Sequence, residues 1–211
     1  MDYDLSTLSE CVRCPRLVAH HVQVRAAYPH YHAAPVGAWG IARARLLIVG
    51  LAPGLHGATR TGRAFVGDAS GEFLFAALHR QGFATHAEPA LARLCNARIT
   101  NVVKCLPPGN APTGSEIQAC SGYLQSELRG FCPLGARTPR VVLTLGGVAH
   151  RAVCRALDVK GAAFGHGSEW RVRPNLTLLS SFHPSRLNVN TGRLTAGMLD
   201  AVLERAAARL A

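Results

Sequence analysis

The sequence predicts an α/β fold, a three-layer sandwich in which a central four-stranded parallel sheet is flanked by helices. Short apolar runs of the length of buried strands alternate along the chain with predicted helices. Strands that alternate with helices form right-handed βαβ units, which place a parallel sheet between two helical layers. The chain has 211 residues, 48% of them hydrophobic, and we expect one globular domain over residues 1–211.

The predicted elements follow in chain order. Residues 46–49 are apolar throughout, which suits a buried parallel strand. A helix at about 70–81 precedes a strand at 98–103, and Asn101 falls at the end of that strand. After a loop at 107–112, the capping box of Thr113 and Glu116 starts a helix that runs to about residue 129. The third strand, 140–145, leads into a helix that begins at Gly146-Gly147 and ends near 157. A glycine-broken segment, 160–167, precedes the fourth strand, 176–181, and a last helix covers about 195–210.

Residues 50–68 form a glycine-rich loop at the carboxyl end of the first strand, where ligands bind in open α/β sheets. Phe65 offers a stacking face there, and Asp68 offers a carboxylate. Small residues let the backbone approach a substrate, so the predicted contacts also include Gly50, Ala52, Pro53 and Gly54. A plain strand-to-helix turn is the alternative, but the glycine content over this length favours a binding site.

A second candidate segment follows the fourth strand, which ends in Phe182-His183-Pro184, with predicted loop residues up to Gly192. Taken alone, a histidine before a proline is more often structural. If the four strands are parallel, however, His183, Asn101 and Asp68 lie at the same edge of the sheet. Their shared position favours a site.

Seven cysteines in a chain without a recognisable export signal argue against a disulfide framework and favour metal binding. Cys11 and Cys14 form a C-x₂-C pair, Cys105 lies before a proline pair, and Cys120 lies on the capped helix. Four thiolates suit either a [4Fe–4S] cluster or zinc. We interpret the other three as small buried apolar residues, namely Cys95, Cys132 and Cys154.

The charge distribution indicates a polyanionic partner. The formal net charge is +11, and no carboxylate occurs between Glu10 and Asp68, an interval that holds seven arginines, Arg63 among them. In that positive surrounding we expect Asp68 to stay ionised. No apolar run is long enough to span a membrane, and we expect a cytoplasmic protein. Neither GxGxxG after a strand nor GxxxxGK[ST] is present, so a nucleotide cofactor is not indicated.

Several motifs together resemble those of one enzyme family, the iron–sulfur uracil-DNA glycosylases of family 5, or B type. The motifs are Gly50-Leu51-Ala52-Pro53-Gly54, His56-Gly57, the stretch from Arg60 to Asp68, the stretch from Thr100 to Cys105, His183-Pro184-Ser185 with Asn188, and the four cysteines. Family 4 carries a glutamate where this chain has Leu51, and the best-known family has a polar residue near Ala52. In one departure from family 5, Thr59 stands where asparagine is usual.

The resemblance implies excision of uracil and other deaminated bases, such as hypoxanthine and xanthine, from DNA, and a [4Fe–4S] cluster on Cys11, Cys14, Cys105 and Cys120. A flipped base would stack on Phe65, while the amide of Asn101 would pair with its edge. His183 and backbone N–H groups at 50–54 would stabilise the leaving base, and Asp68 would position or activate water. The predicted DNA contacts are those of Arg63, Ser185, Arg186, Leu187 and Asn188, with Arg186 and Leu187 in the minor groove.

Two other functions remain open at this point. The chain could be a non-catalytic iron–sulfur protein that binds DNA lesions with the same fold, although Asp68, Asn101 and His183 together weigh against it. It could also be a redox-dependent or zinc-dependent regulator that uses its basic surface. We expect a monomer, because DNA needs the open face of the site.

Overall fold

The computed structural model describes residues 3–211, so the first two residues of the predicted domain lie outside it. Its sheet has the strand order β1-β3-β2-β4-β6-β5. The four strands at the centre are parallel and correspond to the four predicted strands. They are β2 (Leu46–Gly50), β3 (Ala97–Asn101), β4 (Arg140–Leu145) and β6 (Leu176–Ser181). The predicted α/β class and the parallel centre of the sheet are confirmed.

The sheet also has two strands that were not predicted, an antiparallel strand at each edge. β1 (Trp39–Gly40) pairs with β3, and β5 (Glu169–Arg173) pairs with β6. β1 is two residues long, and Glu169 and Arg171 make β5 polar, so neither segment is an apolar run. Edge strands do not need to be apolar on both faces, which is why hydrophobicity did not reveal them.

The helices lie near their predicted positions. A 3₁₀ helix, η1 (Leu5–Glu10), and α1 (Pro15–Ala27) precede the sheet. The predicted helices are α3 (Ala69–Arg80), α4 (Gly114–Phe131), α5 (Gly147–Ala156) and α7 (Ala196–Leu210), each within two residues of its expected ends. The capping box of α4 is confirmed, since Thr113 and Glu116 each accept the other's backbone N–H.

Three segments predicted as loops contain short helices. These are α2 (Ala58–Thr61) within the glycine-rich stretch, η2 (Pro108–Asn110) in the proline-rich loop, and α6 (Arg186–Asn190) after His183. The last is a correction with a clear cause. The Ser185 side chain accepts the Asn188 N–H at 3.4 Å and so caps a single helical turn.

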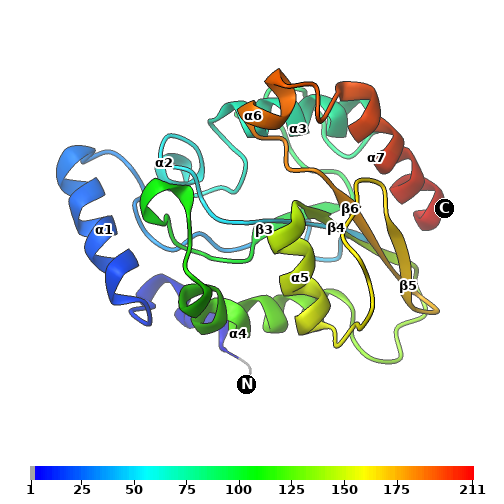
Figure 1. Ribbon diagram of the computed structural model, residues 1–211, viewed down its shortest axis with the longest axis horizontal. Coiled ribbons are helices and arrows are strands. Elements are labelled where there is room, and N and C mark those ends of the chain that lie inside the picture. The colour runs from blue at the N-terminus through cyan, green and yellow to red at the C-terminus, as the bar shows by residue number, and fades with distance from the viewer. Residues whose placement is uncertain (1–2) are drawn as a thin grey trace.

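Successive side chains of the central strands point to opposite faces of the sheet and belong to two hydrophobic clusters, one on each face. Leu46 and Ile48 pack in the cluster that includes α3 and α7, whereas Leu47 and Val49 pack against α4 and α5. Figure 1 shows the same arrangement, with α3 and α7 above the sheet and α4 and α5 below it. Both faces of the central strands are therefore covered, as is usual for a parallel sheet.

The prediction for the three remaining cysteines is confirmed in part. Cys132 and Cys154 are buried in the cluster beside α4 and α5. The prediction for Cys95 is wrong, because Cys95 is only half-buried in the connection before β3. Across residues 3–211, no helix is long and apolar enough to cross a membrane.

Candidate functional site

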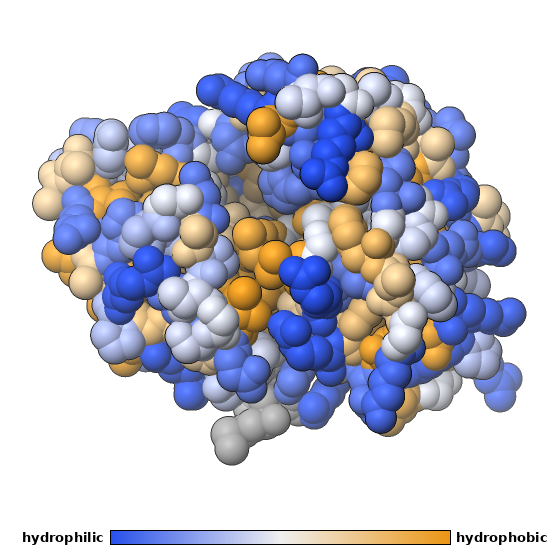
Figure 2. Space-filling view, in the orientation of Figure 1, coloured by the Kyte–Doolittle hydropathy of each residue, from blue (hydrophilic) through white to orange (hydrophobic). Residues whose placement is uncertain are grey.

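A cavity of about 450 Å³ lies at the carboxyl ends of β2, β3 and β6. Figure 2 shows a recess near the middle of this face, between the positions of α2 and α6 in Figure 1. Its lining comes from the glycine-rich stretch, from the end of β3 and from the segment after β6. The expectation that these distant segments share one crevice is confirmed.

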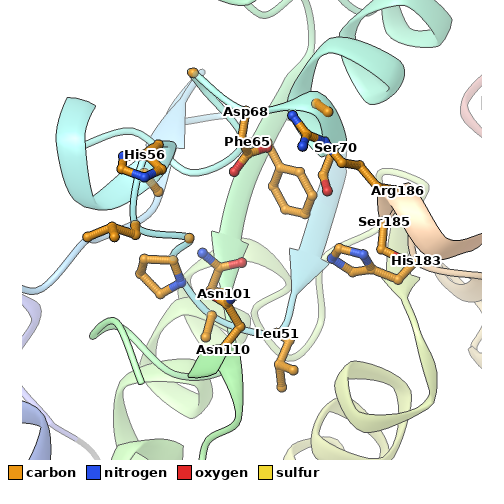
Figure 3. A pocket seen from close by; sticks show the side chains of 17 residues that line it. Leu51, His56, Phe65, Asp68, Ser70, Asn101, Asn110, His183, Ser185 and Arg186 are labelled. Atoms are coloured by element: carbon orange, nitrogen blue, oxygen red, sulfur yellow. The ribbon is translucent and has the colours of Figure 1, made fainter. Parts of the chain in front are cut away.

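The floor of the pocket combines a glycine, an amide and an aromatic ring. A Cβ atom at Gly50 would lie 2.6 Å from Cε2 of Phe65 and would also meet Oδ1 of Asn101, so only glycine allows both side chains over the end of β2. Phe65 has φ of 60°, a left-handed conformation that is rare for a bulky residue. Oδ1 of Asn101 is buried and has no hydrogen-bond partner within residues 3–211. In Figure 3 the amide of Asn101 faces the cavity beside the ring of Phe65.

Asp68 has a structural role besides lining the pocket. Its Oδ1 accepts the Gly71 N–H at 2.9 Å and thereby caps α3. The other carboxylate oxygen lies against Gly57, where any Cβ atom would collide with it. The cap and Gly57 thus fix one side of the carboxylate, which Figure 3 shows above the cavity near Phe65.

His183 lies across the pocket from Asn101 (Figure 3). Burial lowers the pKa of its imidazole, and the negative charge of Asp68 opposes this only in part. The ring is therefore neutral at neutral pH and carries one N–H donor. Its ring centroid lies 5.9 Å from that of Phe65. Asn188 fixes the backbone at this position, because its side-chain amide donates to the His183 carbonyl oxygen at 2.8 Å.

Of the residues predicted to contact DNA, two line the pocket, two lie outside its lining, and one supports the backbone of His183. Ser185 and Arg186 line the mouth of the pocket. Leu187 is outside the lining and 71% exposed on α6, whereas Asn188 serves the backbone of His183. Arg63 is also outside the lining, and its guanidinium lies 5.3 Å from the centroid of the Trp39 ring. Of the small residues, Ala52, Pro53 and Gly54 line the pocket, while Gly50 lies beneath Phe65 and Asn101.

Three polar residues of the pocket were not predicted as contacts, namely His56, Ser70 and Asn110. His56 stood inside a recognised motif, and its Nδ1 lies 2.9 Å from the hydroxyl of Tyr31. Ser70 lies in the first turn of α3, so its position after the cap Asp68 was a usable signal. Asn110 has φ of 57° in a loop far along the chain, and no local pattern places it here.

The four cysteines predicted to hold a cluster line a second, small cavity beside the segment that follows β3. Cys11 and Cys14 flank the turn between η1 and α1, Cys105 follows β3, and Cys120 belongs to α4. The rest of the lining is mostly apolar, and the backbone N–H of Lys104 donates to Sγ of Cys120 at 3.3 Å. Segments about a hundred residues apart in sequence therefore bring their thiols together.

The thiols influence one another's ionisation. Burial raises the pKa of Cys105 to about 12, and the neighbouring thiols of Cys120, Cys11 and Cys14 add to the effect. Burial also raises the pKa of Cys120 to about 11, with Lys104 opposing it. Within residues 3–211, no group of three or more His, Cys, Asp or Glu side chains is arranged to hold a single metal ion.

Comparison with known proteins adds an independent observation. The family model of the Uracil DNA glycosylase superfamily matches residues 38–207. The Type-5 uracil-DNA glycosylase of Pyrobaculum aerophilum is 42% identical over 97% of this chain and 91% of its own length. The chain belongs to the type 5 branch of the uracil-DNA glycosylase superfamily.

Other type 5 relatives agree. The Type-5 uracil-DNA glycosylase of Thermus thermophilus is 40% identical over 96% of this chain and 94% of its own length. The corresponding protein of Mycobacterium tuberculosis is 42% identical over 94% of this chain and 78% of its own length. The Type-4 uracil-DNA glycosylase of Pyrobaculum aerophilum is 35% identical, over 56% of this chain. The family resemblance seen in the sequence is thereby confirmed. Thr59, the departure from that family's pattern, is fully buried and lies outside the pocket lining.

Proposed function

We propose that this type 5 family member is a DNA repair glycosylase that flips uracil out of DNA and hydrolyses its N-glycosidic bond, leaving an abasic site. The observation that carries the proposal is the unpaired, buried amide oxygen of Asn101 beside the ring of Phe65, in a cavity of about 450 Å³. A buried polar atom without a partner costs free energy, and a bound ligand that donates a hydrogen bond removes that cost.

Base recognition follows from the chemistry of an amide. The side chain of Asn101 offers one acceptor and two donors, which match the N3–H donor and a carbonyl acceptor of uracil. Phe65 supplies a flat apolar surface for the ring of the base. Cytosine presents no N3–H, so the same amide orientation leaves Oδ1 unpaired and favours uracil.

The bond-breaking step separates charge. Water adds to C1′ of the sugar as the C1′–N1 bond breaks, the electron pair of that bond leaves with the base, and a proton from water finally neutralises the uracil anion. The neutral His183 donates its N–H to a carbonyl oxygen of the leaving base as negative charge develops there. Backbone N–H groups around 50–54 act on the same anion.

Asp68 acts on the other half of the reaction. Its carboxylate stabilises the positive charge that develops on the sugar and orients the attacking water. Leu51 and Ala52, which also line the pocket, are apolar and cannot hold that water. The cap to Gly71 keeps the carboxylate fixed before the substrate arrives.

The base range extends beyond uracil in this proposal. A cavity of about 450 Å³ lies within the size range of ordinary small-molecule pockets, roughly 300–1,000 Å³, and does not restrict entry to a pyrimidine. Hypoxanthine and xanthine are therefore proposed as further substrates. Their purine rings are larger than a pyrimidine, so we expect only uracil to fill the pairing geometry of the Asn101 amide.

Contacts to the duplex come from the rim. The exposed Leu187 and its neighbour Arg186 enter the gap left by the flipped base, while Arg63 and Ser185 contact phosphates. Asn188 supports this segment through its bond to His183. One copy of the chain acts alone, since the open side of the pocket must receive DNA.

A [4Fe–4S] cluster is proposed on Cys11, Cys14, Cys105 and Cys120. The fit rests on the convergence of four thiols on one apolar cavity. A cluster binds each thiolate to a different iron, so its ligands need not converge on one point, which agrees with the lack of a single-ion arrangement in residues 3–211. The cluster would tie the turn before α1 to β3 and α4, a structural task away from the reacting atoms.

The proposed function is tested by single-turnover excision from duplexes that differ only in the damaged base. Asn101→Ala removes hydrogen bonds worth roughly 1 kcal/mol each, and the uracil rate should fall tenfold or more, with a smaller loss for hypoxanthine. Asn175→Ala, which alters an amide that contacts Cys132 Sγ at 3.8 Å, is the control and should change neither rate. Equal loss on both bases would show that Asn101 does not read the base. Tight binding of uracil DNA without release of the base would favour the lesion-binding alternative.

A further inference from the structure

Lys104 lines the cysteine cavity but is not part of the lining of the pocket. It belongs to the motif 100–105, in which Asn101 lines the pocket and Cys105 lines the cysteine cavity. Its side chain is 1% exposed, and a lysine is almost never so deeply buried unless it is paired.

Every N–H of the buried ammonium has an acceptor. Nζ donates to Thr100 Oγ1 at 2.6 Å, to the backbone oxygen of Asn101 at 2.8 Å and to Glu127 Oε2 at 2.6 Å. The Thr100 hydroxyl donates to the same glutamate oxygen at 2.9 Å. Glu127 belongs to α4 and is 4% exposed, so this closed network joins α4 to the last two residues of β3.

The network holds the backbone where the sheet no longer can. On the outer side of β3, β1 pairs only with Arg98 and Ile99 and ends before Asn101. On the inner side, the Val102 N–H donates to the Gly50 carbonyl at 3.0 Å. Lys104 therefore supplies the outer hydrogen bond that fixes the peptide plane next to the Asn101 side chain. A rotation of that plane would turn the amide away from the pocket.

Stability alone does not explain two buried charges at this place. Burial of an ion pair carries a desolvation cost, and replacement by apolar residues of similar volume is often neutral or stabilising. An apolar pair, however, cannot donate a hydrogen bond to the carbonyl of Asn101. The geometry therefore explains the Lys104–Glu127 pair by the hydrogen bond from Lys104 that fixes the Asn101 carbonyl.

We propose that Lys104 and Glu127 are positioning residues, which hold the Asn101 amide in the orientation that reads the base. This inference rests on the proposed function, because it concerns the same pocket. It assigns specificity to two side chains that do not line the pocket and never touch the substrate.

The test compares two variants by single-turnover excision of uracil, by melting temperature and by iron content. The double variant Lys104→Met/Glu127→Leu removes both charges and keeps apolar bulk, so it should fold. Its uracil rate should fall at least tenfold, while its iron content and its affinity for undamaged duplex stay unchanged. Ser126→Ala is the matched control, since Ser126 precedes Glu127 on α4 but bonds to the backbone of Tyr3, at 3.1 and 2.7 Å, instead of β3. It should keep the wild-type rate.

A second arm repeats the double change in an Asn101→Ala background. If the pair acts through Asn101, it should lower the rate less than twofold there, because the amide it positions is already gone. Losses that multiply in full would overturn the inference. A double variant within twofold of wild type, or one whose rate falls only in step with lost iron, would overturn it as well. A wild-type protein that leaves uracil in place would overturn the proposed function and this inference with it, so the wild type alone separates the two failures.

Discussion

Asp68 combines a helix cap with a catalytic charge, and two substitutions separate these roles. Asp68→Asn keeps the size and an acceptor for the Gly71 N–H, whereas Asp68→Ala removes the cap. Asparagine and aspartate are about equal as N-caps, so Asp68→Asn should lose only the interaction with the helix dipole, about 0.3–1 kcal/mol. Asp68→Ala should lose about 1 kcal/mol more, or roughly 2–4 °C in melting temperature for a chain of this size.

The catalytic effect should follow a different order. Both variants lack the negative charge that stabilises the sugar, so both should slow single-turnover cleavage by a similar factor, about 10²- to 10³-fold, as when one preorganised electrostatic partner is removed. The assay is single-turnover cleavage at saturating enzyme, beside thermal unfolding of the same preparations. If Asp68→Asn cleaved within tenfold of wild type while Asp68→Ala did not, the carboxylate would be a cap and nothing more. If Asp68→Asn spared one base and abolished another, Asp68 would instead read the base.

Three further predictions concern the metal site, the basic surface and the buried His21. The Cys105→Ala variant should lose iron and solubility together. The Cys95→Ala variant should keep both, because Cys95 is half-buried and lies outside the cavity. An active protein that holds zinc in place of iron would contradict the cluster. Affinity for undamaged duplex should fall log-linearly with salt, and Arg63→Ala should lower the slope by about one if Arg63 meets a phosphate, whereas Arg209→Ala, whose partner is Glu169 at 2.6 Å, should not. Burial lowers the pKa of His21 to about 4, and the neutral imidazole accepts the Leu106 N–H. Because the folded pKa lies below the unfolded value of 6.5, His21 contributes its full stability above pH 6.5, and this contribution is lost as the pH falls toward 4. This contribution should reach at most about 3 kcal/mol, and His21→Gln should flatten the stability curve between those pH values; an unchanged curve would assign the acid sensitivity to other groups.

The sequence predicted the centre of the fold because its signals are local. β2 is an apolar run and β4 is apolar over most of its length, and Thr113 and Glu116 mark the start of α4 within four residues. The strands β1 and β5 lack such a signal, since an edge strand needs only backbone pairing. The one-turn helix α6 was also missed, because Pro184 and Asn188 resemble loop residues and its N-cap is the hydroxyl of a single serine, Ser185.

The site was predictable where topology dictates position. Asn101 ends one parallel strand and Asp68 and His183 follow two others, so their meeting at one edge follows from strand direction. Asn110 and the pairing of Lys104 with Glu127 depend on how α4 and its preceding loop pack on β3, which no pattern in the sequence states. Tertiary pairing of this kind requires coordinates.

Excision of uracil by the pocket of Asn101, Phe65 and His183 is measured most directly as the release of free base from a duplex with a single uracil. We predict stoichiometric release of uracil in one turnover, an abasic site that alkali cleaves, and a large loss of rate in His183→Ala with DNA binding retained. A wild-type protein that binds this duplex and releases no uracil, with its metal site filled, would contradict the proposed excision.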